Sequence, residues 1–243
     1  MTTPSHLGPL IAGQRLTPEV MQRLRDAASK TGVSYEFLVA QASVESGFYG
    51  KAQSQRSSAA GLFQFTGATW LRMMHDHGAK YGYAELARKT KLAPNGVAVA
   101  DEETEARILD LRRDDRLSAL FAAEYAKSNG ARLEAVTGRK ASAAELHLAH
   151  LLGPNGAIRF LKAHDANENQ VAAKVVPSAA RQNPDLFYAR GRRSAKSVAA
   201  VYQKIQERLD APLRQVVEIE TENLRPALGL SDSLPRQRTD RRA

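Results

Sequence analysis

The residue of this 243-residue chain that is best placed for acid–base chemistry is Glu45. Leu38, Ala42 and Glu45 follow an i, i+4, i+7 spacing, so on a helix the carboxyl group continues an apolar stripe. Gly47 predicts that this helix ends here, where the helix dipole is negative. Apolar surroundings and the dipole should both raise the pKa of Glu45. An acid that stays protonated near neutral pH can protonate a glycosidic oxygen, although a glutamate at a helix end is more often a solvated surface charge.

A second motif, Gly61-Leu62-Phe63-Gln64-Phe65, ends a polar loop that follows Glu45. Between Ser46 and His75 the chain contains no Asp or Glu. Glycosidases with two carboxylates need a second acid to activate water or to form a covalent intermediate. The loop therefore favours chemistry with one carboxylate, unless Asp114 or Asp115 folds back to the site.

The elements that must position these residues are helical. Thr17-Pro18-Glu19 predicts a helix start and Gly32 its end, and Ser34 caps the next helix. Residues 49–65 predict a loop, residues 78–100 a looser stretch, and almost nothing predicts a strand. The helices are expected at about 18–31, 35–45, 68–77, two within 101–128 broken near Asp114, 142–153, 156–164, and one from Ser194 or Ser197 onwards. The fold class is all-α, with an N-terminal arm at 1–16 and a basic, flexible tail at 213–243.

The two motifs together resemble the soluble lytic transglycosylase (SLT) family of the lysozyme-like superfamily. Glu45 and Ser46 match its Glu-Ser motif, and Gly61, Leu62 and Gln64 match its Gly-Leu-Met-Gln motif, with Phe63 at the Met position and 19 residues from Glu45 to Gln64. The resemblance covers roughly Leu16 to Leu161. It implies a lysozyme-like helical domain with additional C-terminal helices over 17–212. It also implies that Glu45 is catalytic and that Ser46, Gly61, Phe63 and Gln64 bind substrate.

A third family motif, Ala-Tyr-Asn-Ala-Gly, has its best counterpart in residues 149–153, which keep the Ala and the Gly. His150, or His147 one turn earlier, could supply the polar contact that the family tyrosine gives, so both are candidate substrate-binding residues. Two ordinary helix histidines, one packed and one solvated, are the equally weighted alternative.

The resemblance implies that Glu45 first protonates the oxygen between N-acetylmuramic acid and N-acetylglucosamine in peptidoglycan. It then removes the proton of the muramic C6 hydroxyl, which closes a 1,6-anhydro ring without a cofactor. A hydrolytic muramidase on the same fold is the nearest alternative, and a non-catalytic peptidoglycan-binding or assembly protein is another. The site of action is then the bacterial periplasm, with an envelope-spanning or phage assembly as a conceivable partner. The N-terminus shows no secretory signal, which leaves the export route open.

The composition of the chain excludes several other classes of protein and of binding site. The chain lacks cysteine, which excludes disulfides and thiolate zinc sites, and no apolar run is long enough to span a membrane. The net charge of +9 favours polyanionic partners, but the basic residues are mixed with acids along helices, so nucleic acid is not favoured. His75-Asp76-His77 and the set Glu145, His147 and His150 could ligate a metal, but without a His-Glu-x-x-His motif we expect none.

Overall fold

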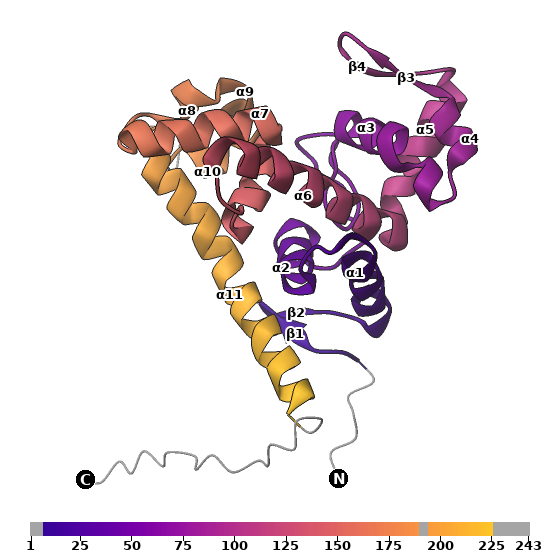
Figure 1. Cartoon of the computed structure of the whole chain (residues 1–243), viewed down its shortest axis with the longest axis horizontal. Helices are drawn as coiled ribbons and strands as arrows, with labels where there is room; N and C mark the ends of the chain where they lie inside the picture. Colours follow the sequence, from indigo (N-terminus) through magenta and orange to yellow (C-terminus); the bar gives the residue numbers. More distant parts are fainter. Residues whose placement is uncertain (1–6, 190–193, 226–243) are drawn as a thin grey trace.

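The computed structural model describes residues 7–189 and 194–225, and these are mainly helical. The expected all-α class is confirmed. Figure 1 shows α6 (Asp115–Thr137) joining two groups of elements: α1 to α5 with two short hairpins, and α7 to α10. Among the described helices, none combines the length and hydrophobicity that a membrane span requires.

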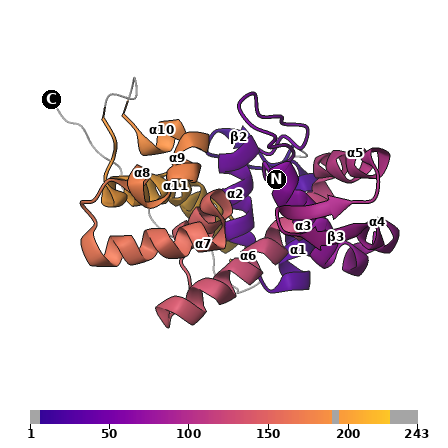
Figure 2. The ribbon, with the colours of Figure 1, turned by 90° about the horizontal axis from the view of Figure 1, so that it is seen from above.

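The helix that carries Glu45 is bounded by caps that the sequence specifies. α1 (Pro18–Thr31) begins at the Thr17 cap and ends at Gly32, which has a φ of 77°. α2 (Tyr35–Ser46) begins where the Ser34 hydroxyl accepts a hydrogen bond from the Phe37 N–H. Figure 2 shows α2 on the side of the first group that faces α7 to α10, so both groups can reach its C-terminal end.

The segment 78–100 contains more regular structure than expected. After α3 (Gly67–His77) come a 3-10 turn, η1 (Ala79–Tyr81), and α4 (Ala84–Arg88). The structure adds a hairpin that the sequence did not predict, in which β3 (Thr90–Ala93) and β4 (Gly96–Val99) pair in antiparallel fashion. Pro94 and Asn95 make its two-residue turn, and Gly96 has a φ of 135°. The helix α5 (Glu102–Asp110) and the 3-10 turn η2 (Leu111–Arg113) then lead into α6, with the break near Asp114 where it was expected.

The second group begins with α7 (Ala143–Asn167), which opens on the capping box of Ser142 and Glu145. Gly153, with φ 69° and ψ 161°, interrupts α7 just before Pro154, so its two parts correspond to the two helices expected at 142–153 and 156–164. Three short helices and then the long final helix follow. These elements are α8 (Ala172–Val175), α9 (Pro177–Gln182), α10 (Pro184–Phe187) and α11 (Val198–Leu224).

The structure differs from the expectation at both ends of the chain, in the N-terminal arm and in the C-terminal tail. The described part of the arm forms a hairpin of β1 (Leu10–Ile11) and β2 (Gln14–Arg15), and Ile11 is fully buried. The tail was placed from residue 213, but α11 continues to Leu224 because Val216 is buried and Glu220 pairs with Arg25 at 2.6 Å. Residues 1–6, the basic cluster at 190–193 and residues 226–243 lie outside the described residues.

The described residues form two hydrophobic cores. The first is built around Trp70 and Phe121, and the second around Phe160 and Phe187. α11 contributes Val201 and Ile205 to the second core and Val216 to the first, so it holds the two units together along α2.

Candidate active site

Glu45 lies in the last turn of α2, with only 12% of its side chain exposed. Burial raises its pKa to about 8, and the positive charge of Arg208 on α11 partly opposes that shift. Its Oε1 atom is buried and has no hydrogen-bond partner among the described residues. Near neutral pH this carboxyl group therefore holds its proton, as an acid catalyst requires.

Two histidines of α7 face the same carboxyl oxygen. His147 Nδ1 lies 3.7 Å and His150 Nε2 lies 3.6 Å from Glu45 Oε1, and the two rings are stacked with an interplanar angle of 5°. Burial lowers the pKa of His147 to about 3 and that of His150 to about 4, so both rings are neutral at pH 7. Because His150 Nε2 lies 3.0 Å from the carbonyl oxygen of Phe63, which can only accept, this nitrogen carries the ring proton. The histidines thus surround the acid without bringing a charge to it.

The Glu-Ser motif and the second motif are joined by one hydrogen bond. The hydroxyl of Ser46 donates to the carbonyl oxygen of Leu62 at 2.7 Å, which fixes the loop against the end of α2. Gln64 follows with a φ of 48°, and its amide nitrogen donates to the carbonyl oxygens of Ala52 and Gly61. The amide oxygen of Gln64 is therefore left to accept a hydrogen bond at the cavity wall.

Four residues expected to bind substrate do not line the cavity. Ser46 does not line it and bonds the loop instead. The side chain of Phe63 is fully buried in the first core, and only its backbone carbonyl reaches the site, through His150. Gly61 has a φ of 82°, and a Cβ there would overlap the carbonyl oxygen of Arg112. His147 is 1% exposed and touches Glu45 rather than the open cavity.

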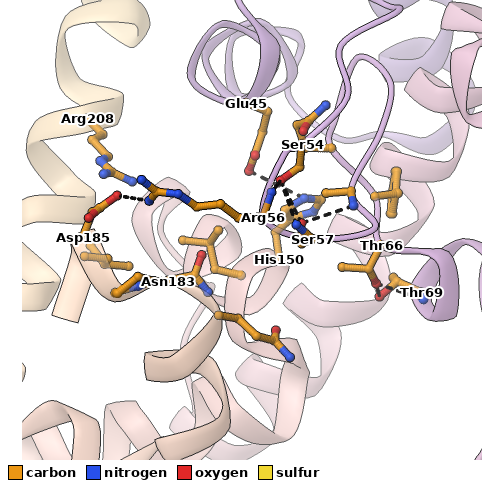
Figure 3. Close-up of a pocket in the computed structure, with 17 residues that line it drawn as sticks. Glu45, Ser54, Arg56, Ser57, Thr66, Thr69, His150, Asn183, Asp185 and Arg208 are labelled. Carbon is orange, nitrogen blue, oxygen red and sulfur yellow. Dashed lines mark hydrogen bonds and ion pairs between the residues drawn. The ribbon is translucent and has the colours of Figure 1, made fainter.

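The cavity beside Glu45 has a volume of about 320 Å³ and lies between the two cores (Figure 3). One wall comes from the loop after α2 and the start of α3, and the other from α7, α10 and α11. A neighbouring cavity of about 360 Å³ shares Thr66, Thr69 and His150 with it, so the cleft continues along α7. Apart from Glu45, the polar lining of the cavity beside it consists of Ser54, Arg56, Ser57, Gln64, Thr66, Thr69, His150, Gln182, Asn183, Asp185 and Arg208.

Sequence reasoning missed the charged groups other than Glu45 that line the cavity. Arg56, in the loop, pairs with Asp185 of α10 across the cavity at 2.6 Å, and Arg208 reaches the cavity from α11 (Figure 3). No local pattern distinguishes these residues from other surface charges. Only the packing of α10 and α11 brings them to Glu45.

Other acids and histidines that the sequence singled out lie elsewhere. Asp114 caps α6 and Asp115 follows it, and neither lines the cavity. His75 bonds the Thr90 hydroxyl at 2.9 Å, and His77 lies 3.9 Å from Glu124. Within residues 7–189 and 194–225, no three His, Asp or Glu side chains are grouped to hold a metal ion.

A helical domain in which a helix end holds one buried acid beside a polar cleft has the architecture of a lysozyme-like domain. The family model of the transglycosylase SLT domain matches residues 22–87, which include α1, α2, the motif loop and α3. This segment is therefore an SLT domain, a member of the lysozyme-like superfamily. At the level of the family, its function is of the lytic transglycosylase type and is directed at peptidoglycan in the cell envelope. The histidines of α7 and the walls from α10 and α11 lie beyond the matched residues.

Proposed function

We propose that this protein cleaves the β-1,4 bond between N-acetylmuramic acid and N-acetylglucosamine in peptidoglycan and leaves a 1,6-anhydro-muramoyl end. The observation that carries the proposal is the buried carboxyl group of Glu45, which remains protonated near neutral pH at the wall of a polar cavity. The SLT match and the paired motifs around this residue support the same reaction.

The reaction needs one carboxyl group that acts twice. Glu45 donates its proton to the glycosidic oxygen as the bond to the muramic C1 atom breaks, and the substrate's N-acetyl group stabilises that carbon. The muramic C6 oxygen then bonds to C1, and its proton returns to Glu45. No water is consumed. Because burial disfavours the carboxylate, Glu45 readily takes the second proton, while the positive charge of Arg208 limits that preference.

The neighbours of Glu45 act by positioning it. Neutral His147 and His150 confine Oε1 on the buried side, so that the other carboxyl oxygen is presented to the cavity. Ser46 keeps the motif loop against α2, and the amide oxygen of Gln64 accepts a hydrogen bond from substrate. A glutamate fixed in this way loses little entropy on reaching the reactive geometry.

One observation favours hydrolysis as the second candidate. Asp185 is a carboxylate in the cavity lining, and a hydrolase needs such a group to activate water. However, Asp185 is paired with Arg56 and its side chain is 76% exposed, which suits a surface ion pair better than a base.

The test is digestion of purified peptidoglycan by the full chain and by Glu45→Gln. The variant keeps the shape and polarity of the side chain but has no proton to donate, so the rate should fall at least ~10²-fold. Glu134→Gln is the matched control, because Glu134 is exposed on α6 away from the cavity. Mass spectrometry of the released muropeptides identifies the reaction, since anhydro ends are lighter by one water than reducing ends. Reducing ends in the bulk product would make this a muramidase, and an active Glu45→Gln would remove the assigned acid.

We further infer that the chain works in the periplasm. Its association with an envelope-spanning or phage assembly is a proposal that co-purification from the native host would test.

A further inference from the structure

Arg208 projects from α11 into the cavity that also contains Glu45 (Figure 3). It is an exposed residue, and within the described parts of the chain it forms no hydrogen bond and no ion pair. Its charge is nevertheless felt inside the site, because it opposes the raised pKa of Glu45 and lowers that of His147. A guanidinium group with five donors and no acceptor is thus available at the cavity wall.

Ion pairs account for some of the other charged residues of α11. Lys204 lies 3.7 Å from Glu207 on the same helix, and Glu220 pairs with Arg25 of α1 at 2.6 Å. Arg208 belongs to neither pair, and it differs from Arg214, another exposed arginine of α11, in that it lines the cavity.

The charges in the lining of the cavity also favour a role for Arg208 in binding a ligand. Arg56 and Asp185 neutralise each other at 2.6 Å, and Glu45 is uncharged while it holds its proton. The remaining polar lining consists of hydroxyl, amide and neutral imidazole groups. Arg208 therefore leaves one uncompensated positive charge in the described lining of the cavity, which favours a ligand that brings a negative charge.

We infer that Arg208 forms an anion subsite that binds a carboxylate of the muramoyl residue next to the bond being cleaved. This inference rests on the proposed function and specifies which form of the glycan strand is preferred. The 3-O-lactyl group of a muramoyl residue ends in a free carboxylate when the strand carries no peptide. When a stem peptide is attached, the peptide supplies the carboxylates instead. The planar guanidinium can bind either in a bidentate manner.

The expected contribution is moderate because Arg208 is exposed. A carboxylate bound by one solvent-accessible arginine should gain about fivefold in affinity, which corresponds to about 1 kcal/mol. The gain should shrink at high salt, which screens exposed charges.

The experiment measures binding in the full-length Glu45→Gln background, so that the strands stay intact, by calorimetry with short soluble strands. Four ligands are compared: strands without peptides, strands with stem peptides, and each of these after conversion of its carboxylates to neutral methylamides. Arg208→Gln removes the positive charge. Arg208→Lys keeps the charge but lacks the planar guanidinium that binds a carboxylate through two N–H groups. Arg214→Gln is the matched control, because Arg214 is an exposed arginine on α11 that does not line the cavity.

The measured quantity is the ratio of the dissociation constants for the methylamide and the free-acid form of each ligand. With Arg208 present this ratio should be about five for at least one ligand pair, and Arg208→Gln should bring it close to one. Arg208→Lys should retain part of the ratio, and Arg214→Gln all of it. If the ratio exceeds one only for strands without peptides, the bound group is the lactyl carboxylate. If it exceeds one only for peptide-bearing strands, the bound group is a carboxylate of the stem peptide.

The inference is overturned by a ratio that Arg208→Gln leaves unchanged, by a ratio of one in the parent protein, or by the absence of binding to all four ligands. These outcomes are independent of the proposed function, which the products of the unmodified enzyme decide. Anhydro ends together with an unchanged ratio would retain the reaction and remove only the subsite.

Discussion

The burial of Glu45 predicts that the protein loses stability as the pH rises, and that Glu45→Gln abolishes this loss. Below pH 4.5, the unfolded chain and the folded protein both hold the proton of Glu45. Between pH 4.5 and about 8, the unfolded chain releases this proton while the folded protein keeps it, so the unfolded state is favoured progressively. Above about pH 8 both states are ionised, and the effect of this group stops growing.

The magnitude follows from the pKa difference. At pH 7 the pH lies 2.5 units above the unfolded value of 4.5. At about 1.4 kcal/mol per unit, Glu45 lowers the free energy of unfolding by about 3 kcal/mol relative to a neutral side chain in its place. Such a difference is a large part of the stability of an ordinary domain.

The assay is denaturant unfolding of the parent protein and Glu45→Gln from pH 4.5 to pH 8. The difference between their free energies of unfolding should grow by about 3 kcal/mol between pH 4.5 and pH 7. Glu134→Gln, at an exposed position of α6, should show no comparable growth. A difference for Glu45→Gln that does not change with pH would show that the carboxyl group is solvated, and would refute the argument that burial keeps it protonated.

The other predictions concern activity and the motif loop. Glycan cleavage should decline as the pH rises through about 8, because Glu45 then loses the proton it must donate; a pH–rate profile with no such limb would contradict this. Gly61→Ala should destabilise the protein by at least about 2 kcal/mol in thermal unfolding, because the Cβ atom would overlap the carbonyl oxygen of Arg112 at a left-handed φ. Phe63→Ala should cost about 3–5 kcal/mol of stability, since its ring is fully buried, and a fold of unchanged stability would place the ring outside the core.

Much of the local structure was determined by the sequence itself. Thr17 and Ser34 start the first two helices and Gly32 and Gly47 end them, because side-chain oxygens and left-handed glycines satisfy the free backbone groups at helix ends. These signals act over three or four residues and are readable from the chain. The same holds for the paired motifs, whose matches to the SLT family fall within residues 22–87.

The hairpin of β3 and β4 and the last turns of α11 were not readable in this way. Val216 and Glu220 extend α11 because the first core and Arg25 receive them, and these contacts join residues almost 200 positions apart in sequence. The apolar period weakens there, so the helix depends on packing rather than on local propensity.

The roles of individual site residues were likewise decided by tertiary structure. Sequence spacing placed Glu45 on an apolar stripe, but its burial is completed by His147 and His150, about a hundred residues further along the chain. The close approach of Gly61 to the backbone of Arg112, about fifty residues further along the chain, was not visible in the sequence. Arg208 reaches the cavity only because α11 folds back along α2. Capping and hydrogen-bond motifs are local and appear in the sequence, whereas desolvation and the electric field at a carboxyl group depend on every element packed around it.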